Sequence, residues 1–220
     1  MLSDLKAVLL DMDGTLFDSE VVYKSLWQKT AYDFGIDLND KVYQSFVGAH
    51  FDTCKQLIQE LGDENFVLND FLAAMDRQDD AQRVPLLKPG AADLLQWLQT
   101  QMIPVALVTS AAQEEVEKNF AGLGGTSAFK VIVCGDDVEN RKPHPEPYQL
   151  ACKRLGISPE QALAVEDSNT GTLSAITAGC QTVVVPDILP ITAEIERHLV
   201  AKLDSLVQLP GLLMNVHKQL

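Results

Sequence analysis

Two aspartates, Asp11 and Asp13, stand close together directly after a short apolar run near the start of the chain. Gly14 follows them, and Asp18 comes a few residues later. Carboxylates at this spacing can point to the same side of an extended chain, where one could act as a nucleophile, an acid or base, or a metal ligand. A solvated, aspartate-rich turn would also explain this run on its own, so the rest of the sequence has to separate the two interpretations.

Polar residues also follow three later apolar runs. Thr109 and Ser110 end one run, Lys142 follows another, and Glu166 and Asp167 end a third. If these runs are strands of one parallel sheet, their carboxyl ends meet at one edge, where open α/β sheets bind ligands. Crowded carboxylates need a divalent cation, and ligation by oxygen alone favours Mg²⁺. A magnesium ion, a lysine and a hydroxyl together suit a phosphoryl group, whose transfer a carboxylate can begin by attacking phosphorus.

The elements that must position these residues alternate along the chain. Five short apolar runs predict buried strands, and amphipathic segments between them predict helices. This alternation predicts the α/β class with a doubly wound parallel sheet and right-handed crossovers. The predicted strands are 6–12, 104–110, 131–137, 162–168 and 181–186, and the predicted helices are 91–101, 112–123, 146–155 and 168–178.

One long segment departs from this alternation. From about residue 20 to residue 87 the apolar spacing is helical throughout, and no strand-like run interrupts it. Proline and glycine mark the return to the alternating pattern near Pro85 and Pro89. We therefore predict an α/β core formed by residues 1–18 and 85–220, with a helical domain of residues 19–84 inserted after the first strand.

The motifs resemble those of the haloacid dehalogenase superfamily, and most of all the branch that includes β-phosphoglucomutase and phosphoglycolate phosphatase. In chain order they read Asp11-Met-Asp13-Gly-Thr-Leu-Phe-Asp18, Leu107-Val-Thr109-Ser110, Arg141-Lys142-Pro143-His-Pro145-Glu-Pro-Tyr148 and Val165-Glu166-Asp167-Ser168-Asn-Thr-Gly171. The resemblance extends over essentially the whole chain. It implies a Rossmann-like core in which the inserted helical domain serves as a cap.

The resemblance also implies roles for the four acidic residues. Asp11 would be the nucleophile that forms an aspartyl-phosphate, and Asp13 would be the general acid and then the base that activates water. Asp11, Asp167 and the backbone carbonyl of Asp13 would hold Mg²⁺, with Glu166 nearby or bound through water. The residue types alone agree with phosphoryl transfer, whereas the separate roles of Asp11 and Asp13 come only from the family.

Other residues would bind the substrate. The resemblance assigns Thr109, the Ser110 amide and Lys142 to the oxygens of the phosphoryl group. Tyr23 and His50 are candidates for substrate contact from the helical domain, although a histidine in an exposed loop would also explain His50.

Three functions stay open at this point. The first is a Mg²⁺-dependent phosphatase acting on a small phosphorylated metabolite such as a sugar phosphate. The second is a hexose-phosphate mutase; against it, Tyr23 stands where β-phosphoglucomutases carry a histidine, and Phe51 stands where they carry an arginine. The third is a non-catalytic binding protein on the same fold, which the intact Asp11, Asp13 and Lys142 disfavour.

Composition limits the partners. Of the 220 residues, 17 are Lys or Arg and 31 are Asp or Glu, so the net charge is −14. This charge argues against nucleic acids and anionic membranes as partners, because both require clustered basic residues. The start of the chain lacks the pattern of a signal peptide, and the four cysteines have no metal-binding spacing. We therefore expect a cytoplasmic monomer with reduced thiols.

Overall fold

The computed structural model describes residues 4–47, 51–79 and 86–217. The chain forms two compact units, which we call the core unit (Met1–Asp18 and Leu86–Leu220) and the helical unit (Ser19–Pro85). Each unit has its own hydrophobic core. Their roles as catalytic core and cap stay a prediction, since a division by contacts assigns no role.

The core unit is built on one parallel sheet. Six strands stand in the order β3-β2-β1-β4-β5-β6, and each pairs in parallel with its neighbours. The predicted α/β class with a doubly wound sheet is confirmed, and a sixth strand of two residues adds to the five predicted. The strands are β1 (Ala7–Leu10), β2 (Val105–Val108), β3 (Val131–Val133), β4 (Ala162–Glu166), β5 (Gln181–Val184) and β6 (Ala201–Lys202).

The register of the central strands brings the polar ends together. Leu10 of β1 pairs with Leu107 of β2 on one side and with Val165 of β4 on the other. Asp11 directly follows Leu10 at the end of β1 and is therefore level with Val108 and Glu166. The strand order also reverses between β1 and β4, and such a switch point is where open α/β sheets place their ligands.

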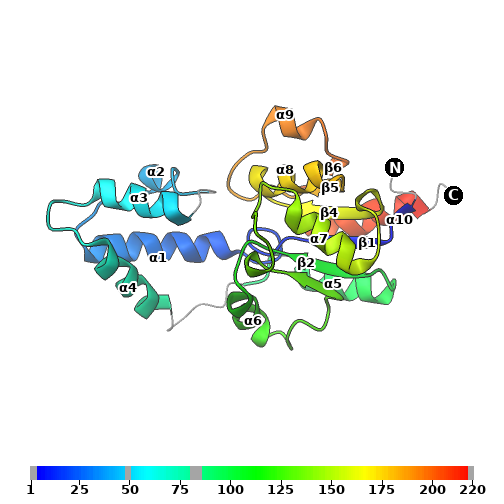
Figure 1. Ribbon diagram of the computed structural model, residues 1–220, viewed down its shortest axis with the longest axis horizontal. Coiled ribbons are helices and arrows are strands. Elements are labelled where there is room, and N and C mark those ends of the chain that lie inside the picture. The colour runs from blue at the N-terminus through cyan, green and yellow to red at the C-terminus, as the bar shows by residue number, and fades with distance from the viewer. Residues whose placement is uncertain (1–3, 48–50, 80–85, 218–220) are drawn as a thin grey trace. The chain divides into compact units, whose positions relative to one another are not determined.

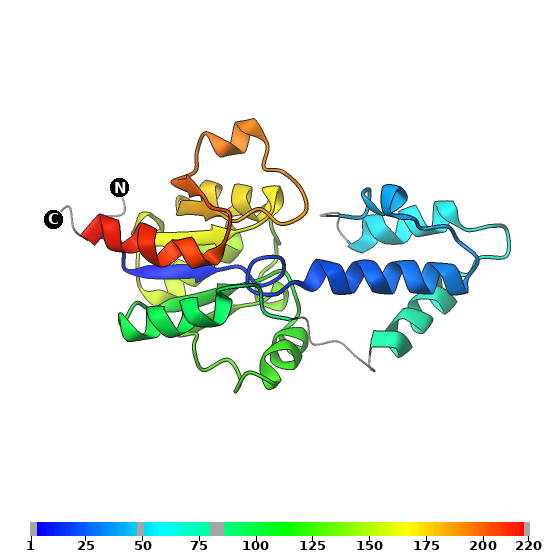
Figure 2. The same ribbon diagram turned by 180° about the vertical axis from the view of Figure 1, so that it is seen from behind.

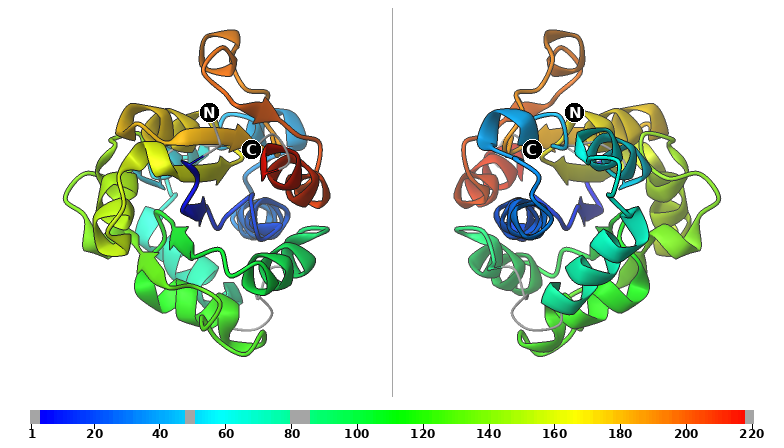
Figure 3. Two further views of the ribbon diagram at one scale, coloured as in Figure 1. Left: turned by 90° about the vertical axis from the view of Figure 1, so that its right-hand side faces the viewer. Right: turned by 90° about the vertical axis from the view of Figure 1, so that its left-hand side faces the viewer.

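Helices cover both faces of the sheet. Figure 1 shows α7 (Glu146–Leu155) and α8 (Asn169–Ala178) toward one face, and Figure 2 shows α5 (Ala91–Thr100) and α10 (Leu209–His217) on the opposite face. The two groups lie on opposite sides of the strands in the end-on views of Figure 3. Both α6 (Gln113–Ala121) and the short α9 (Ala193–Glu196) also belong to the core unit. A sheet that is covered on both faces explains why its strands are continuous apolar runs.

The two faces of the sheet have different compositions. Four alanines from three strands face α7 and α8 together with Leu9, whereas the other leucines of the same strands pack with α5, α6 and α10. The alternation of side chains along a strand produces this division, because neighbouring residues point to opposite faces. The alanines are Ala7, Ala106, Ala162 and Ala164, and the leucines are Leu10, Leu107 and Leu163.

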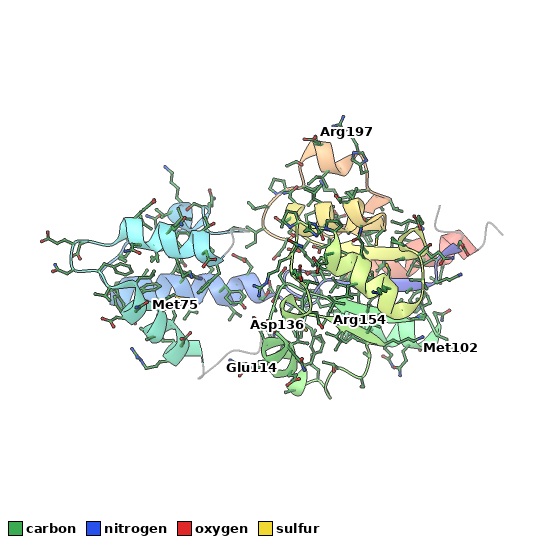
Figure 4. All side chains as sticks on the ribbon, in the orientation of Figure 1. Met75, Met102, Glu114, Asp136, Arg154 and Arg197 are labelled. Atoms are coloured by element: carbon green, nitrogen blue, oxygen red, sulfur yellow. The ribbon has the colours of Figure 1, made fainter. Side chains whose placement is uncertain are left out.

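The helical unit packs around a cluster of aromatic side chains. Trp27 of α1 lies 5.2 Å from Phe46 and 5.6 Å from Phe71, measured between ring centroids. Met75, labelled in Figure 4, is buried in the same cluster. The helices are α1 (Ser19–Asp33), α2 (Asp40–Tyr43), α3 (Phe51–Leu61) and α4 (Leu68–Asp79). In the described part of the chain, no helix combines the length and apolar character that a membrane span requires.

Candidate active site

The loop after β1 folds tightly and fixes its two aspartates. The N–H of Gly14 donates to the carbonyl of Phe17 at 2.9 Å, and the N–H groups of Leu16 and Phe17 both donate to the carbonyl of Met12. Gly14 has φ = 82°, a conformation that a residue with a side chain rarely adopts. The loop therefore holds Asp13 in a short closed turn immediately beyond Asp11.

Lys142 connects three strand ends through a single buried ammonium group. Its Nζ donates to Oδ1 of Asp11 at 2.6 Å, to Oε1 of Glu166 at 2.6 Å and to the carbonyl of Val108 at 2.9 Å. The Lys142 side chain is only 5% exposed. Burial alone would lower the pKa of Lys142, but the charges of Asp11 and Glu166 overcome this effect and raise it. Lys142 is therefore a permanent cation at the end of the sheet.

The loop that carries Lys142 is braced from two helices. The Glu146 carboxylate, in the first turn of α7, accepts hydrogen bonds from the backbone and side-chain amides of Asn140. The Ser174 hydroxyl of α8 donates to the carbonyl of His144 at 2.6 Å. These bonds hold the chain on both sides of Lys142.

Tyr148 contacts both partners of the Lys142–Glu166 ion pair. Its hydroxyl donates to Oε1 of Glu166 at 2.6 Å, and Nζ of Lys142 lies 5.1 Å from the centroid of its ring. Tyr148 and Glu166 are almost completely inaccessible to solvent. Burial and the adjacent negative charge of Glu166 raise the pKa of Tyr148, so the phenol stays a proton donor.

The carboxylates of Asp11, Glu166 and Asp167 form a group that could hold a cation. One ligand atom from each lies within 4.8 Å of the others. Among the described residues, Oδ2 of Asp11 is buried without a hydrogen-bond partner. Burial, followed by the charge of Glu166, raises the pKa of Asp11 to about 7, whereas Lys142 opposes this rise; the charge of Asp13 contributes to it. A buried carboxylate oxygen without a partner, surrounded by other carboxylates, fits a hard divalent cation such as Mg²⁺.

Gly14 and Gly171 leave room for these carboxylates. A Cβ atom on Gly14 would lie 2.2 Å from Oδ2 of Asp167, and one on Gly171 would lie 2.1 Å from both carboxylate oxygens of Glu166. Ser168 caps α8 by accepting a hydrogen bond from the Gly171 N–H, which starts the helix directly after the two acids. Glycine is thus required at both positions by close approach of an acidic side chain.

The other residues predicted to bind phosphate lie at the same sheet edge. Thr109 follows β2, is buried, and its hydroxyl oxygen accepts a hydrogen bond from the Ala111 N–H at 3.0 Å. Ser110 comes next and is exposed. Of the two candidates in the helical unit, Tyr23 is half-buried on α1 against the aromatic cluster, and His50 lies outside the described residues.

The comparisons with known proteins agree with this geometry. A sequence profile described as haloacid dehalogenase-like hydrolase matches residues 8–185, which is most of the chain. The chain belongs to the haloacid dehalogenase-like hydrolases. It is an enzyme of the type that hydrolyses phosphoric monoesters.

Individual relatives of this haloacid dehalogenase-like chain are named phosphatases. It is 30% identical to a phosphorylated carbohydrates phosphatase of Thermotoga maritima, over 80% of this chain and 83% of that protein. It is 33% identical to a validoxylamine A 7′-phosphate phosphatase of Streptomyces hygroscopicus, over 79% and 82%. A solved family hydrolase from Deinococcus radiodurans, with bound phosphate and sodium, superposes with a TM-score of 0.82 at 27% identity and covers 98% of this chain and 97% of its own.

Three residues at the site of this hydrolase were not singled out from the sequence. Tyr148 was assigned only to a helix, although it ends the quoted lysine motif. Asp187 follows the fifth predicted strand, so the rule that located the other acidic residues at strand ends would have found it. Lys88 forms an ion pair with Asp187 and gives no signal in the sequence, because the pairing depends on the order of strands in the sheet.

Proposed function

We propose that this hydrolase is a Mg²⁺-dependent phosphatase that acts on a small phosphorylated metabolite, such as a sugar phosphate, through an aspartyl-phosphate on Asp11. One observation carries the proposal. Asp11, Glu166 and Asp167 converge within 4.8 Å at the switch point of the sheet, with Lys142 bonded to two of them. This combination provides a nucleophile, a cation site and a fixed positive charge at one place, as phosphoryl transfer requires.

The metal would be held by side chains that already face one another. Asp11 and Asp167 would bind it directly, together with the backbone carbonyl of Asp13, and Glu166 would contribute nearby or through water. A bound Mg²⁺ would offset the negative charge of these carboxylates and of the phosphoryl oxygens.

The first half of the reaction transfers the phosphoryl group to the protein. The Asp11 carboxylate attacks phosphorus, and the bond from phosphorus to the leaving oxygen breaks. Asp13 gives its proton to that oxygen, so the product leaves as a neutral alcohol. Thr109, the Ser110 amide and Lys142 bind the oxygens of the phosphoryl group and stabilise the charge that spreads over them.

The second half uses the same residues in reverse roles. Asp13, now a carboxylate, takes a proton from water, and the oxygen of that water attacks phosphorus. The bond between phosphorus and Asp11 breaks, which releases inorganic phosphate and regenerates the Asp11 carboxylate. The Lys142 ammonium group donates directly to Oδ1 of Asp11 and so favours the ionised carboxylate that attacks phosphorus and that leaves in this second half.

The assignment of the two units belongs to the same proposal. Residues 1–18 and 85–220 would form the catalytic core and residues 19–84 the cap, with Tyr23 and His50 contributing to substrate selection. We further propose that the enzyme is a cytoplasmic monomer. In support of a reducing location, the four cysteines, all in the described part of the chain, are buried and form no disulfide.

The test is phosphate release by the purified protein from sugar phosphates, phosphoglycolate, nucleotides and p-nitrophenyl phosphate, with Mg²⁺ or with EDTA. We expect release that depends on Mg²⁺, is lost in Asp11→Asn and persists in Asp93→Asn, a matched change at an exposed position on α5. Activity in Asp11→Asn equal to that of the parent would refute the nucleophile. Conversion of a hexose 1-phosphate to its 6-phosphate without release of phosphate would instead establish a mutase.

A further inference from the structure

A second ion pair lies beside the carboxylate group, formed by Lys88 and Asp187. Lys88 belongs to the segment that returns to the core unit, where its backbone N–H donates to the carbonyl of Leu16 at 2.8 Å. The preceding residue, Leu87, pairs with Phe17 in an antiparallel bridge. This backbone pairing fixes Lys88 next to the loop that carries the two aspartates. Its Nζ donates to Oδ1 of Asp187, and both side chains are largely buried, at 16% and 17% exposed.

Asp187 lies close to a predicted metal ligand. It follows β5, and its Oδ2 would be 3.3 Å from a Cβ atom on Gly14, the same position that Oδ2 of Asp167 approaches to 2.2 Å. The two carboxylates therefore flank a single glycine. The charge of Asp187 is also one of the causes that raise the pKa of Asp167, after burial and the charges of Asp11 and Glu166.

The charges in this region add up in a simple way. With a divalent cation bound, Asp11, Glu166 and Asp167 would all be ionised and Lys142 positive, which leaves a net charge of −2 for the cation to neutralise. Asp13 adds nothing in the protonated form that its proposed acid role requires. Asp187 would add a further negative charge if it stood alone.

We propose that Lys88 is a positioning residue that neutralises Asp187 and thereby sets the balance between cation and phosphoryl affinity at the adjacent carboxylates. The inference rests on the proposed Mg²⁺-dependent function and extends it to residues that take no part in the chemistry. Without Lys88, Asp187 would strengthen cation binding and repel the phosphoryl group. Without Asp187, Lys88 would repel the cation.

The direct test measures Mg²⁺ binding by isothermal titration calorimetry, with no substrate present. By Coulomb's law, a unit charge about 8 Å from a divalent cation changes its affinity by about sixfold at the dielectric constant of water and by far more at the lower value of a protein surface, so roughly tenfold corresponds to a strongly screened site. We therefore expect Lys88→Met to bind Mg²⁺ about tenfold more tightly and Asp187→Asn to bind it about tenfold more weakly. The double variant and Lys88→Arg should both stay within about threefold of the parent.

A second titration uses inorganic phosphate at saturating Mg²⁺. Lys88→Met should bind phosphate more weakly and Asp187→Asn more tightly, opposite to the order for Mg²⁺. Circular dichroism and melting in EDTA identify any variant that fails to fold, and Asp187→Asn, which leaves the charge of Lys88 unpaired, keeps the test available if Lys88→Met is one of these.

The outcomes separate the inference from the proposed function. Shifts of opposite sign that cancel in the double variant support the inference. Weaker Mg²⁺ binding in both single variants, or shifts below threefold in all of them, would overturn it, because the pair would then only anchor the backbone around Lys88. If the parent itself bound no Mg²⁺, the proposed metal dependence would fail and the inference would fail with it.

Discussion

Replacing Tyr148 by phenylalanine removes one oxygen atom from the centre of the site. The ring would remain beneath Lys142, because the cation lies over its face and not against its hydroxyl. Only the hydrogen bond to Oε1 of Glu166 would be lost. The change therefore isolates the contribution of this bond to the stability of the buried acid.

The expected cost is about 2 kcal/mol. A hydrogen bond to a charged group contributes about 1.5–3 kcal/mol, and leaving a buried acceptor short of a partner adds to the loss. Glu166 keeps its bond to Lys142 at 2.6 Å, and its other oxygen accepts two longer bonds, from the Asp167 N–H at 3.3 Å and from the Ser168 hydroxyl at 3.4 Å. The retained ion pair places the estimate in the lower half of that range. It corresponds to a melting temperature lower by roughly 4–8 °C.

The two tryptophans make the assay specific. Trp97 lies on α5 in the core unit, whereas Trp27 lies on α1 in the helical unit. In a Trp27→Phe background, fluorescence during urea unfolding reports the core unit alone. In a Trp97→Phe background it reports the helical unit.

Tyr43→Phe provides the matched control. The Tyr43 hydroxyl donates to Glu20 at 3.0 Å within the helical unit, so this variant removes the same kind of bond from the other unit. We expect Tyr148→Phe to shift only the Trp97 transition and Tyr43→Phe to shift only the Trp27 transition. A loss below about 0.5 kcal/mol for Tyr148→Phe, or an equal effect of both variants on the Trp97 signal, would refute the reasoning.

Three further predictions concern stability. Gly171→Ala should destabilise the core unit by more than about 2 kcal/mol, because its Cβ would lie 2.1 Å from both oxygens of a fixed Glu166 carboxylate. An unchanged midpoint of urea unfolding would contradict this. Met102, labelled in Figure 4, has φ = 56° and is 88% exposed. Met102→Gly should therefore raise the free energy of unfolding by up to about 1 kcal/mol, measured by thermal unfolding. A similar gain from Met102→Ala would show that backbone strain is not the cause. The hydrogen bond from Arg154 lowers the pKa of Asp137 below its unfolded value, so this pair stabilises the protein at neutral pH and loses its effect progressively as the pH falls below about 4. With both partners partly exposed we expect less than about 1 kcal/mol, and a stability difference between the parent and Asp137→Asn that did not shrink as the pH was lowered below about 4 would count against it.

Most of the fold could be predicted because it follows from burial. Strands covered on both faces appear as continuous apolar runs, and the helices between them bury one face, so both leave a local pattern. The strand β6 escaped prediction because two residues, Ala201 and Lys202, are too few to form a pattern. The short helix α2 escaped for a similar reason: it has four residues, and the cap that Asn39 provides is its main sequence signal.

The location of the candidate site could be predicted from the sequence, whereas the contacts within it could not. Asp11, Lys142 and Glu166 could be placed near one another because each follows the carboxyl end of a strand, and parallel strands share that edge. The partners of these residues depend on the order of strands and on the register between them. Tyr148 reaches Glu166 only because α7 packs against the sheet, over β2 and β3, and no local sequence pattern predicts that packing.

The unequal faces of the sheet determine which substitutions the core unit can tolerate. On the α7 and α8 side, alanines at four strand positions let the helices lie close to the strands, so a larger residue at one of these positions would push α7 or α8 outward. A shift of α7 would move the Tyr148 hydroxyl away from Glu166 and carry the Lys142 loop with it. On the opposite side the leucines fill volume, so the damaging change is loss of size. Neighbouring positions on one strand are therefore under opposite constraints: Ala164 does not tolerate a larger side chain, and Leu163 does not tolerate a smaller one.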